Sequence, residues 1–380
     1  MKVGIVVPYS WSFWGGVVEH AELQARALGR LGNETRRIMG NDPPGSFTRA
    51  LHPRLGRHDS PPPDVIPVGR SVIVPANGSL PNIILSPRTV GRVRRALERE
   101  RFDLLHVHEP LTPAISVAAL ALARTPVVAT FHASGELGWA KAAMHVWGFL
   151  LDRIDQRVAV SEAARQSAQA YAPGDYHVIP NGVLVPPAAD PGARENRVVF
   201  VGRHETRKGL AIMLRAWPEV HARTGARLRI VGSDPLAVRL LMTRERVERS
   251  AIDVLGFLSQ DDLTVELQAA KAMAAPSLGG ESFGMVLMRA FACATPVVAS
   301  DIAGYRDVMD ESAGVMVPPG DPAALAAALV ELLSAEERRR ALGSAARSIA
   351  EERYSWEGIA RRLTDVYELA LGGSRTAVAA

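Results

Sequence analysis

The sequence predicts an α/β protein with two doubly wound domains, each built around a parallel sheet. Its length of 380 residues exceeds the size at which a single hydrophobic core usually keeps growing. Hydrophobic residues make up 47% of the chain and charged residues 22%, and both values are typical of globular proteins. Short β-branched runs alternate with helical patterns throughout, which is typical of βα units and a parallel sheet.

The β-branched runs form two series of six, and this count predicts one sheet in each domain. The first series covers residues 3–7, 34–39, 104–107, 127–131, 157–160 and 177–179. The second series covers residues 197–201, 227–231, 252–255, 272–275, 296–299 and 314–317.

A linker is predicted between the two series. Residues 186–196 contain three prolines and a glycine and have no apolar periodicity, as is typical of connecting segments. We therefore expect an N-terminal domain over residues 1–188 and a C-terminal domain over residues 189–353. Residues 354–371 have a helical pattern that we expect to pack back on the N-terminal domain, with the pair Gly372-Gly373 ending it and a frayed tail to residue 380.

A second irregular zone covers residues 41–87. It is rich in Pro and Gly and has few apolar residues before residue 64. Long loops of this kind are usually functional or mobile, so we assign this zone to the substrate side of the first domain.

Several protein classes are disfavoured by composition. The single cysteine, Cys293, excludes an intrachain disulfide and indicates a reducing compartment; a small buried residue is the favoured interpretation of it. The N-terminal apolar run stops at Pro8 and is too short for a secretory signal. The longest apolar stretch, residues 114–123, is too short to span a bilayer. The net charge of +4 lies in the first half and is too small for a general nucleic-acid binder.

The residues directly after each predicted strand deserve inspection, because ligands in open α/β sheets bind beyond the carboxyl ends of the strands. After the first strand, Gly15 and Gly16 precede a helix that begins near Val17. Backbone N–H groups and the positive end of that helix could hold a phosphate. A tight turn would use the same glycines, so both interpretations stay open.

The loop after the seventh strand carries Arg203 and Lys208. A guanidinium fork and a point charge together suit a diphosphate. The chain has four lysines against forty arginines, so a lysine here is less easily explained as surface filler. The alternative is an ordinary solvated turn.

The segment GGESFG follows the tenth strand. Gly279 and Gly280 permit backbone conformations that other residues resist, and Glu281 and Ser282 stand at the start of a helix. An acid that only complements the helix dipole is the alternative, but it does not account for the glycines on both sides of Glu281, which include Gly284.

Histidines follow two neighbouring strands. In LLHVHEP, His106 and His108 share one face of a strand; a metal site is the minority interpretation, because His106 is expected inside the sheet. His132 lies just beyond the next strand, where it could donate a hydrogen bond to a substrate oxygen. No Asp-x-Asp sequence occurs, so no carboxylate clamp for a metal-bound nucleotide is predicted.

Two regions suggest contact with a membrane. One basic stripe at helical spacing is formed by Arg88, Arg92, Arg95 and Arg99, with Arg94 beside it. Aromatic residues gather at positions 11, 13 and 14, and residues 139–151 have an aromatic, amphipathic pattern. Together they could lie on an anionic bilayer; separately, each is also typical of a solvated helix, a core helix or a packed loop.

Nearly the whole chain resembles the retaining GT-B glycosyltransferases of family 4. The resemblance rests on six motifs in this order: PYS…GG, HEP, TFH, PNGV, GR…RKG and GGESFG. The segments PANGS and SLGGESFG favour a closer likeness to the actinobacterial phosphatidyl-myo-inositol mannosyltransferases, which transfer mannose from GDP-mannose. The resemblance implies a GT-B fold of two Rossmann-like domains with a cleft between them.

The resemblance also implies roles for individual residues. His132, Glu281, Arg203 and Lys208 would be catalytic. The nucleotide-sugar donor would be bound by Gly15, Gly16, Arg203, Lys208, Glu281, Ser282, Phe283, Gly284 and Arg289. The acceptor would be bound by Tyr9, Asn77, Ser79 and His132, and the membrane by Arg88, Arg92, Arg94, Arg95 and Arg99. Members of the family commonly have a second glutamate where this chain has Arg289, and a guanidinium cannot accept ribose hydroxyl protons as a carboxylate does.

The resulting expectation is a metal-independent hexosyltransferase without a cofactor, peripheral on the cytoplasmic face of the cell membrane. It would move a hexose, most plausibly mannose from GDP-mannose, onto phosphatidylinositol or a related lipid. Its partners would be the donor, a lipid or inositol-phosphate acceptor and an anionic membrane surface, without nucleic acid. Two alternatives stay open: another nucleotide-sugar with a soluble acceptor, and a non-catalytic GT-B-like protein that only binds a nucleotide.

Overall fold

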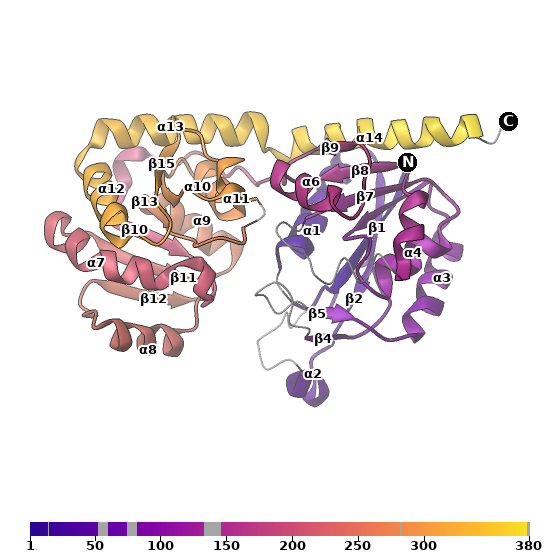
Figure 1. Cartoon of the computed structure of the whole chain (residues 1–380), viewed down its shortest axis with the longest axis horizontal. Coiled ribbons are helices and arrows are strands. Elements are labelled where there is room, and N and C mark those ends of the chain that lie inside the picture. The colour runs from indigo at the N-terminus through magenta and orange to yellow at the C-terminus, as the bar shows by residue number, and fades with distance from the viewer. Residues whose placement is uncertain (14, 52–59, 74–81, 133–145, 282, 378–380) are drawn as a thin grey trace. The chain divides into compact units, whose positions relative to one another are not determined.

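The chain forms two compact units, and each is described here by itself. The computed structural model describes residues 1–13, 15–51, 60–73, 82–132, 146–281 and 283–377 (Figure 1). Unit 1 consists of Met1–Gly182 and Trp356–Ala380, and unit 2 of Val183–Ser355. The sequence predicts these divisions at residues 188/189 and 353/354. The chain enters and leaves unit 2 side by side, since the backbone N–H of Val183 donates to the carbonyl of Tyr354 at 2.7 Å.

Unit 1 contains a nine-stranded sheet whose main path runs β3-β2-β1-β6-β7-β8-β9, with all neighbours on this path parallel. Its strands are β1 (Lys2–Ser10), β2 (Glu34–Gly40), β3 (Val65–Pro67), β4 (Ser71–Ile73), β5 (Asn82–Ile84), β6 (Leu104–His108), β7 (Val127–Phe131), β8 (Gln156–Ala159) and β9 (Tyr176–Val178). Six of them lie where the β-branched runs predicted strands.

The three short strands β3, β4 and β5 were not predicted. They lie inside residues 41–87, and the prediction that this zone is irregular is wrong for them. Each has only three residues, too few for a period-2 pattern to stand out. β3 extends the parallel sheet beyond β2, whereas β4 and β5 pair with each other in antiparallel orientation.

Helices flank the sheet of unit 1. They are α1 (Gly16–Arg30), α2 (Ser46–Leu51), α3 (Arg88–Glu100), α4 (Ile115–Leu122), the 3₁₀ helix η1 (Gly148–Arg153), α6 (Glu162–Gln169) and α14 (Trp356–Ala377). Helix α14, in yellow in Figure 1, packs against α1 and contributes Trp356, Leu363 and Tyr367 to one hydrophobic cluster. The prediction that this helix ends at residue 371 is wrong, because a glycine inside a helix costs only about 1 kcal/mol and does not by itself end it.

Unit 2 contains a six-stranded, fully parallel sheet in the order β12-β11-β10-β13-β14-β15. Its strands are β10 (Glu195–Val201), β11 (Arg227–Val231), β12 (Ile252–Gly256), β13 (Ala270–Ala275), β14 (Val297–Ser300) and β15 (Gly314–Val317). All six coincide with the second predicted series.

The helices of unit 2 connect these strands and include three short 3₁₀ or α segments. They are η2 (Pro191–Ala193), η3 (Thr206–Lys208), α7 (Leu210–Thr224), α8 (Pro235–Glu245), α9 (Gln260–Ala269), α10 (Met285–Ala292), α11 (Ala303–Arg306), α12 (Pro322–Ser334) and α13 (Glu336–Arg353). Side-chain caps fix several starts: Asp321, for example, accepts from the backbone N–H groups of Ala323 and Ala324 ahead of α12.

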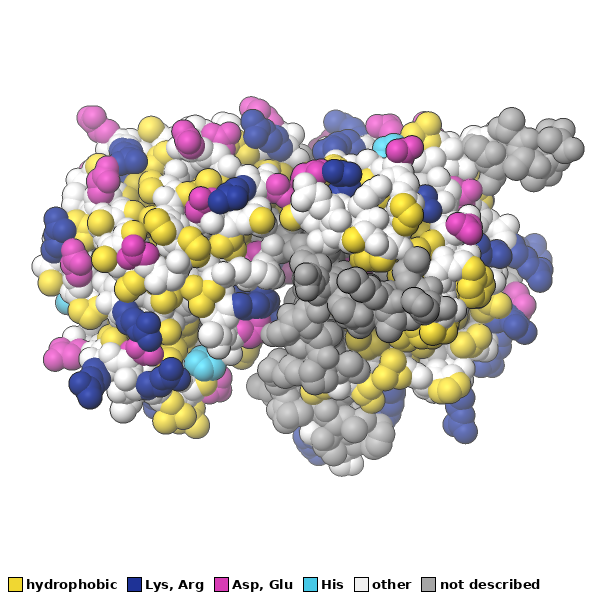
Figure 2. All heavy atoms as spheres, in the orientation of Figure 1, with side chains coloured by type: hydrophobic (Ala, Val, Ile, Leu, Met, Phe, Trp, Pro, Cys, Tyr) yellow, Lys and Arg dark blue, Asp and Glu magenta, His cyan; other side chains and the backbone are white. Residues whose placement is uncertain are grey.

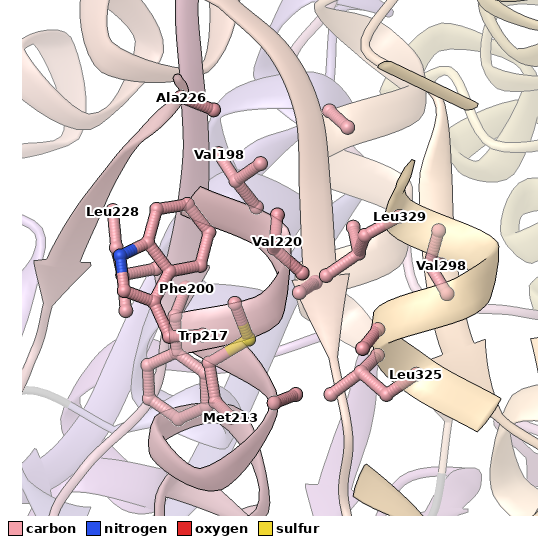
Figure 3. Close-up of a cluster of buried hydrophobic side chains, with 14 of the residues drawn as sticks. Val198, Phe200, Met213, Trp217, Val220, Ala226, Leu228, Val298, Leu325 and Leu329 are labelled. Carbon is pink, nitrogen blue, oxygen red and sulfur yellow. The ribbon is translucent and has the colours of Figure 1, made fainter. Parts of the chain in front are cut away.

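The core of unit 2 forms where α7 and α12 meet the sheet (Figure 3). Trp217 of α7 is 2% exposed and lies beside Phe200 of β10, while Leu325 and Leu329 of α12 are fully buried. Truncating a buried tryptophan of this kind typically costs about 3–5 kcal/mol. This core holds the carboxyl ends of the central strands, and the loops on them, in fixed positions.

No described helix combines the length and the apolar character that crossing a bilayer requires.

Candidate active site

The strand order of each unit indicates where a ligand would bind. The order reverses beside β1 and β6 in unit 1 and beside β10 and β13 in unit 2. Ligands of doubly wound sheets bind at such reversals, beyond the carboxyl ends of the strands. The loop carrying Arg203 and Lys208 follows β10, and GGESFG follows β13, so both predicted donor motifs flank the reversal of unit 2.

Glu281 is held by two cations from the loop after β10. Its Oε1 lies 2.6 Å from Nζ of Lys208 and 2.8 Å from Nη1 of Arg207. The Arg207 guanidinium also donates to the carbonyl oxygen of Gly280 at 3.1 Å. The side chains of Lys208 and Glu281 are only 17% and 11% exposed, so their charges are attenuated by water much less than those of a surface pair.

The ion pairs continue away from Glu281 through Glu205. Arg207 lies 2.9 Å from one oxygen of Glu205, and Arg203 lies 3.0 Å from the other. The structure therefore brings Lys208 to Glu281 but places Arg203 on Glu205, with a side chain 44% exposed. Sequence reasoning missed Arg207 and Glu205. The available signal was the pair of adjacent cations in TRKG, and their spacing does not reveal that both of them reach Glu281.

Two glycines permit the close backbone contacts that build this arrangement. Gly209 has φ 72°, and a Cβ on it would lie 1.7 Å from the carbonyl oxygen of Pro276. A Cβ on Gly304 of α11 would lie 1.8 Å from the carbonyl oxygen of Glu281. The loops after β10 and β13 are thus in direct backbone contact, and the N–H of Leu278 donates to the carbonyl of Arg207 at 2.7 Å.

The remainder of GGESFG turns into helix α10. Gly284 has φ 70° and is the residue before the helix. Phe283 is 3% exposed and packs edge-on against Tyr354 with ring centroids 5.9 Å apart, so only its backbone is available to a ligand. Ser282 lies outside the described residues.

Arg289 lies in the last turn of α10 and is half-buried. It stands near Cys293, which is 4% exposed, as the sequence predicted for a small buried residue. Burial raises the pKa of the Cys293 thiol to about 11, against the opposing charges of Arg194, Arg347 and Arg289. The position eight residues after Glu281 therefore belongs to a cationic neighbourhood.

In unit 1, Gly15 and Gly16 lie at the start of α1, the helix predicted from near Val17. Both are exposed, and no atom lies within 4 Å of where a Cβ would sit on either. Gly15 is the residue before this 15-residue helix, and no side chain caps the helix start. Such an end attracts anions.

His132 belongs to a cluster of buried histidines. It follows β7 directly, is 7% exposed, and its Nε2 lies 2.8 Å from Nδ1 of His108 at the end of β6. His20 of α1 packs edge-on against both rings. Burial lowers the pKa of His20 to about 4 and holds the pKa values of His108 and His132 well below the usual range. All three rings are consequently neutral at pH 7.

Hydrogen bonds fix the surroundings of this cluster. His106, stacked on His108, lies 2.6 Å from the Tyr367 hydroxyl of α14 and 2.6 Å from Oγ1 of Thr130. The backbone N–H of His132 donates to Oε1 of Glu109 at 2.9 Å. The expectation that His106 lies inside the sheet is confirmed, since it is fully buried.

Of the residues predicted to bind the acceptor, Tyr9 and His132 are described. Tyr9 lies near the end of β1 and pairs with Ile83 of β5. Burial, together with the charge of Glu109, raises the pKa of Tyr9 above its usual range, so it stays a neutral phenol. Asn77 and Ser79 lie outside the described residues.

The basic stripe is present as an exposed face of α3. Arg88, Arg92, Arg94, Arg95 and Arg99 are all exposed, whereas Val93 and Ala96 are buried against the unit. Figure 2 shows dark-blue side chains along the border of unit 1 where Figure 1 places α3.

The aromatic residues predicted near the membrane have different environments. Trp11 and Phe13 are 4% and 7% exposed, so for these two the alternative of a packed loop holds. Residue 14 and residues 139–145 lie outside the described part of the chain. Val146 and Phe149 are 58% and 69% exposed and remain available to an apolar environment.

Comparisons with known proteins define the class. Residues 14–184 match the family model for glycosyltransferase family 4, and residues 195–335 match the model for glycosyl transferases group 1. The chain belongs to these glycosyltransferases, and its two Rossmann-like units have the GT-B fold. The resemblance stated from the motifs is thereby confirmed.

Two relatives in sequence and one solved structure show which glycosyltransferases the chain is similar to. The chain is 35% identical to the phosphatidyl-myo-inositol mannosyltransferase of Mycobacterium leprae (strain TN), with all of both chains covered. It is 33% identical to the D-inositol 3-phosphate glycosyltransferase of Segniliparus rotundus over 76% of this chain and 71% of the relative. Among solved structures, sucrose-phosphate synthase from Thermosynechococcus elongatus matches with a TM-score of 0.77 at 21% identity, covering 98% of this chain and 99% of the other. This last likeness supports the fold alone.

Proposed function

We propose that the chain transfers mannose from GDP-mannose to phosphatidylinositol at the cytoplasmic surface of a membrane. The observation that carries the proposal is the 35% identity over the full length with a phosphatidyl-myo-inositol mannosyltransferase. Two further observations support the proposal: the ion pairs of Glu281 with Arg207 and Lys208, and the exposed arginines of α3.

On the donor side, Lys208 and Arg207 supply positive charge beside Glu281. A nucleotide-diphosphate leaving group develops negative charge as its bond to the sugar breaks, and fixed cations stabilise that charge without reorganising. Glu281 accepts hydroxyl protons of the sugar, and the start of α1 at Gly15 and Gly16 offers N–H groups to phosphate oxygens. In this proposal no metal ion or cofactor takes part in the transfer.

The proposed transfer retains the configuration of the anomeric carbon. The bond from the anomeric carbon to the acceptor oxygen forms on the face where the bond to the leaving phosphate breaks, and the acceptor proton passes to that phosphate oxygen. His132 positions the reacting groups and donates a hydrogen bond. Glu281 is likewise a positioning and binding residue, so no covalent intermediate on the protein is required.

On the acceptor side, the arginines of α3 would hold the protein on anionic lipid. Each basic residue near an anionic surface contributes about 1 kcal/mol. Replacing Arg88, Arg92 and Arg95 by Gln should therefore weaken vesicle binding about a hundredfold at low salt. Replacing Arg244, Arg340 and Arg353, which are exposed arginines of unit 2, should leave vesicle binding unchanged. Flotation with phosphatidylinositol vesicles measures both variants.

A donor-by-acceptor panel tests the transfer itself. Purified protein is incubated with GDP-mannose, UDP-glucose or UDP-N-acetylglucosamine, each with and without phosphatidylinositol, in the presence of EDTA, and products are read by mass spectrometry. Among the three donors, we expect only GDP-mannose to give a mannosylated lipid, and only when phosphatidylinositol is present. The Glu281→Gln variant should give no product. If no donor yields a glycosylated lipid, the lipid acceptor is refuted; if EDTA abolishes product, the metal-free mechanism is refuted.

A second candidate is transfer to a soluble inositol phosphate. The 33% identity with a D-inositol 3-phosphate glycosyltransferase favours including this acceptor in the panel. Product from inositol 3-phosphate without any from lipid would select this candidate, and α3 would then have no role in turnover.

A further inference from the structure

Three histidines from separate elements of unit 1 meet in one buried place. They are His20 of α1, His108 of β6 and His132 after β7, and they are 4%, 0% and 7% exposed. One nitrogen from each ring lies within 4.8 Å of a nitrogen from each of the others. These three residues, called here the histidine trio, contain no carboxylate or thiolate.

The trio leaves two buried nitrogens without a partner. In the described part of the chain, neither Nδ1 of His20 nor Nε2 of His108 has a partner with hydrogen-bond geometry, although the side chain of Asn181 lies near enough to His20 to oppose the lowering of its pKa. A buried polar atom without a partner costs about 1–3 kcal/mol, and such atoms in native proteins call for an explanation such as a water or an ion. The packing of α1 on the sheet therefore maintains an arrangement that hydrogen bonds alone do not satisfy.

We propose that the histidine trio is a zinc site. The ring centroids are 5.4 Å apart for His20 and His108, 4.9 Å for His20 and His132, and 5.0 Å for His108 and His132. Three imidazoles bound tetrahedrally to one zinc ion, with Zn–N bonds of about 2.0–2.1 Å, place their centroids about 5 Å apart. The rings thus already have the spacing of three zinc ligands, and small rotations aim their nitrogens at one point.

The chemical state of the rings also suits zinc. A neutral imidazole offers one lone pair to a metal ion and keeps its single proton on the other nitrogen. Zinc would take the place of the hydrogen bond that joins Nδ1 of His108 and Nε2 of His132 at 2.8 Å. Imidazole ligands suit zinc, copper and nickel, whereas magnesium and calcium prefer oxygen. Glu109, whose carboxylate accepts from the backbone N–H of His132, brings a negative charge next to the site.

Zinc bound by three histidines keeps a fourth position for water or a ligand. Zinc bound to His132 would keep that ring from positioning the reacting groups. If His132 acts in transfer as proposed above, zinc would therefore inhibit the transfer. The inference of inhibition therefore rests on the proposed function, whereas the inference of metal binding does not. Zinc would act as a reversible inhibitor of an enzyme whose reaction needs no metal.

Metal binding is tested without any activity measurement. The chelator-treated protein is titrated with zinc chloride by calorimetry, and cobalt(II) is used in a parallel titration because its visible absorption reports four-coordinate geometry. We expect one metal per chain in the wild type. Removing a residue that only hydrogen-bonds to a zinc ligand lowers the zinc affinity about 10–100-fold. Because His20 and His108 are themselves the proposed ligands, His20→Gln and His108→Gln should each lower the zinc affinity at least about a hundredfold.

His177→Gln is the matched control, because His177 lies in unit 1 but bonds to Gln156 on β8 and should bind zinc as the wild type does. Circular dichroism shows whether each variant folds, and a zinc-dependent rise in the wild-type melting temperature gives a measurement independent of variants. A wild type that binds no zinc, or trio variants that bind it as tightly as the wild type, would overturn the site.

Inhibition is measured separately in the transfer assay. Zinc should lower the transfer rate of the wild type and of the His177→Gln variant. The His20→Gln variant should transfer sugar at the same rate with and without zinc. Zinc binding without inhibition would keep the metal site and refute the role of His132 in transfer. Absence of any transfer in chelated protein would refute the proposed function while the calorimetry still decides the site.

Discussion

Adding a single methyl group at Gly304 should disable the site without unfolding the protein. Gly304 lies in α11, and a Cβ there would stand 1.8 Å from the carbonyl oxygen of Glu281. Real Cβ atoms do not approach backbone oxygens closer than 3.0 Å, so Gly304→Ala must drive the two backbones apart by at least about 1 Å. A misplacement of about 1 Å at a catalytic centre can lower the rate about 10²-fold.

We expect kcat/KM for sugar transfer to fall about a hundredfold in Gly304→Ala, while overpacking lowers the free energy of unfolding by only about 1–3 kcal/mol. Initial rates under saturating and limiting donor, with urea unfolding of the same preparations, measure both effects. Gly29→Ala is the control, because Gly29 is an exposed helical residue with no atom within 4 Å of its Cβ position. A Gly304→Ala enzyme that transfers sugar at the wild-type rate would refute the reasoning that the position of Glu281 controls turnover.

Four further outcomes are expected. Lys208→Gln should lower kcat about 10²–10³-fold, as loss of one stabilising donor does elsewhere, whereas an unchanged kcat in rapid-quench assays would remove Lys208 from the leaving-group site. Arg289→Glu should change donor affinity or base preference in calorimetric titrations with GDP and UDP; identical constants would show that the position does not touch the nucleotide. Arg194→Ala should lower the unfolding free energy by about 2–3 kcal/mol in urea, because this side chain donates to the carbonyls of Ala270, Cys293 and Ala294; a loss below 1 kcal/mol would contradict this. Burial raises the pKa of the Cys293 thiol to about 11, so the free energy of unfolding should fall as the pH rises through the pKa of the unfolded thiol towards 11, because the unfolded thiol ionises first; urea unfolding across this pH range should show that a Cys293→Ala variant lacks this part of the pH dependence.

Much of the fold follows from the sequence because its signals are local. β-branched runs and the helical segments between them located twelve strands, and the order of parallel strands then brought the loops after β10 and β13 together. The three-residue strands β3, β4 and β5 escaped, because their pairing depends on neighbours distant in the sequence. The extension of α14 beyond residue 371 escaped because a glycine pair weakens a helix without ending it.

The site was predictable only in part. Positions at strand ends identified Arg203, Lys208 and Glu281, but the ion pairs among them depend on side-chain directions that spacing does not determine. The contact of Arg207 with Glu281 was therefore not predicted, and neither was the contact of Arg203 with Glu205. His20 could not be linked to His132 from the sequence, since α1 meets the end of β7 only through tertiary packing.

The return of α14 to unit 1 has a consequence for how the protein is made. Residues 183–355 leave the ribosome before Trp356, so unit 2 is complete in the nascent chain while unit 1 still lacks its final helix. Until α14 arrives, His106 has no Tyr367 hydroxyl beside it, and the part of α1 that packs against α14 has no partner. Domains generally fold as units during synthesis, but here the unit begun first is finished last, and its histidines reach their native surroundings only when nearly the whole chain has been translated.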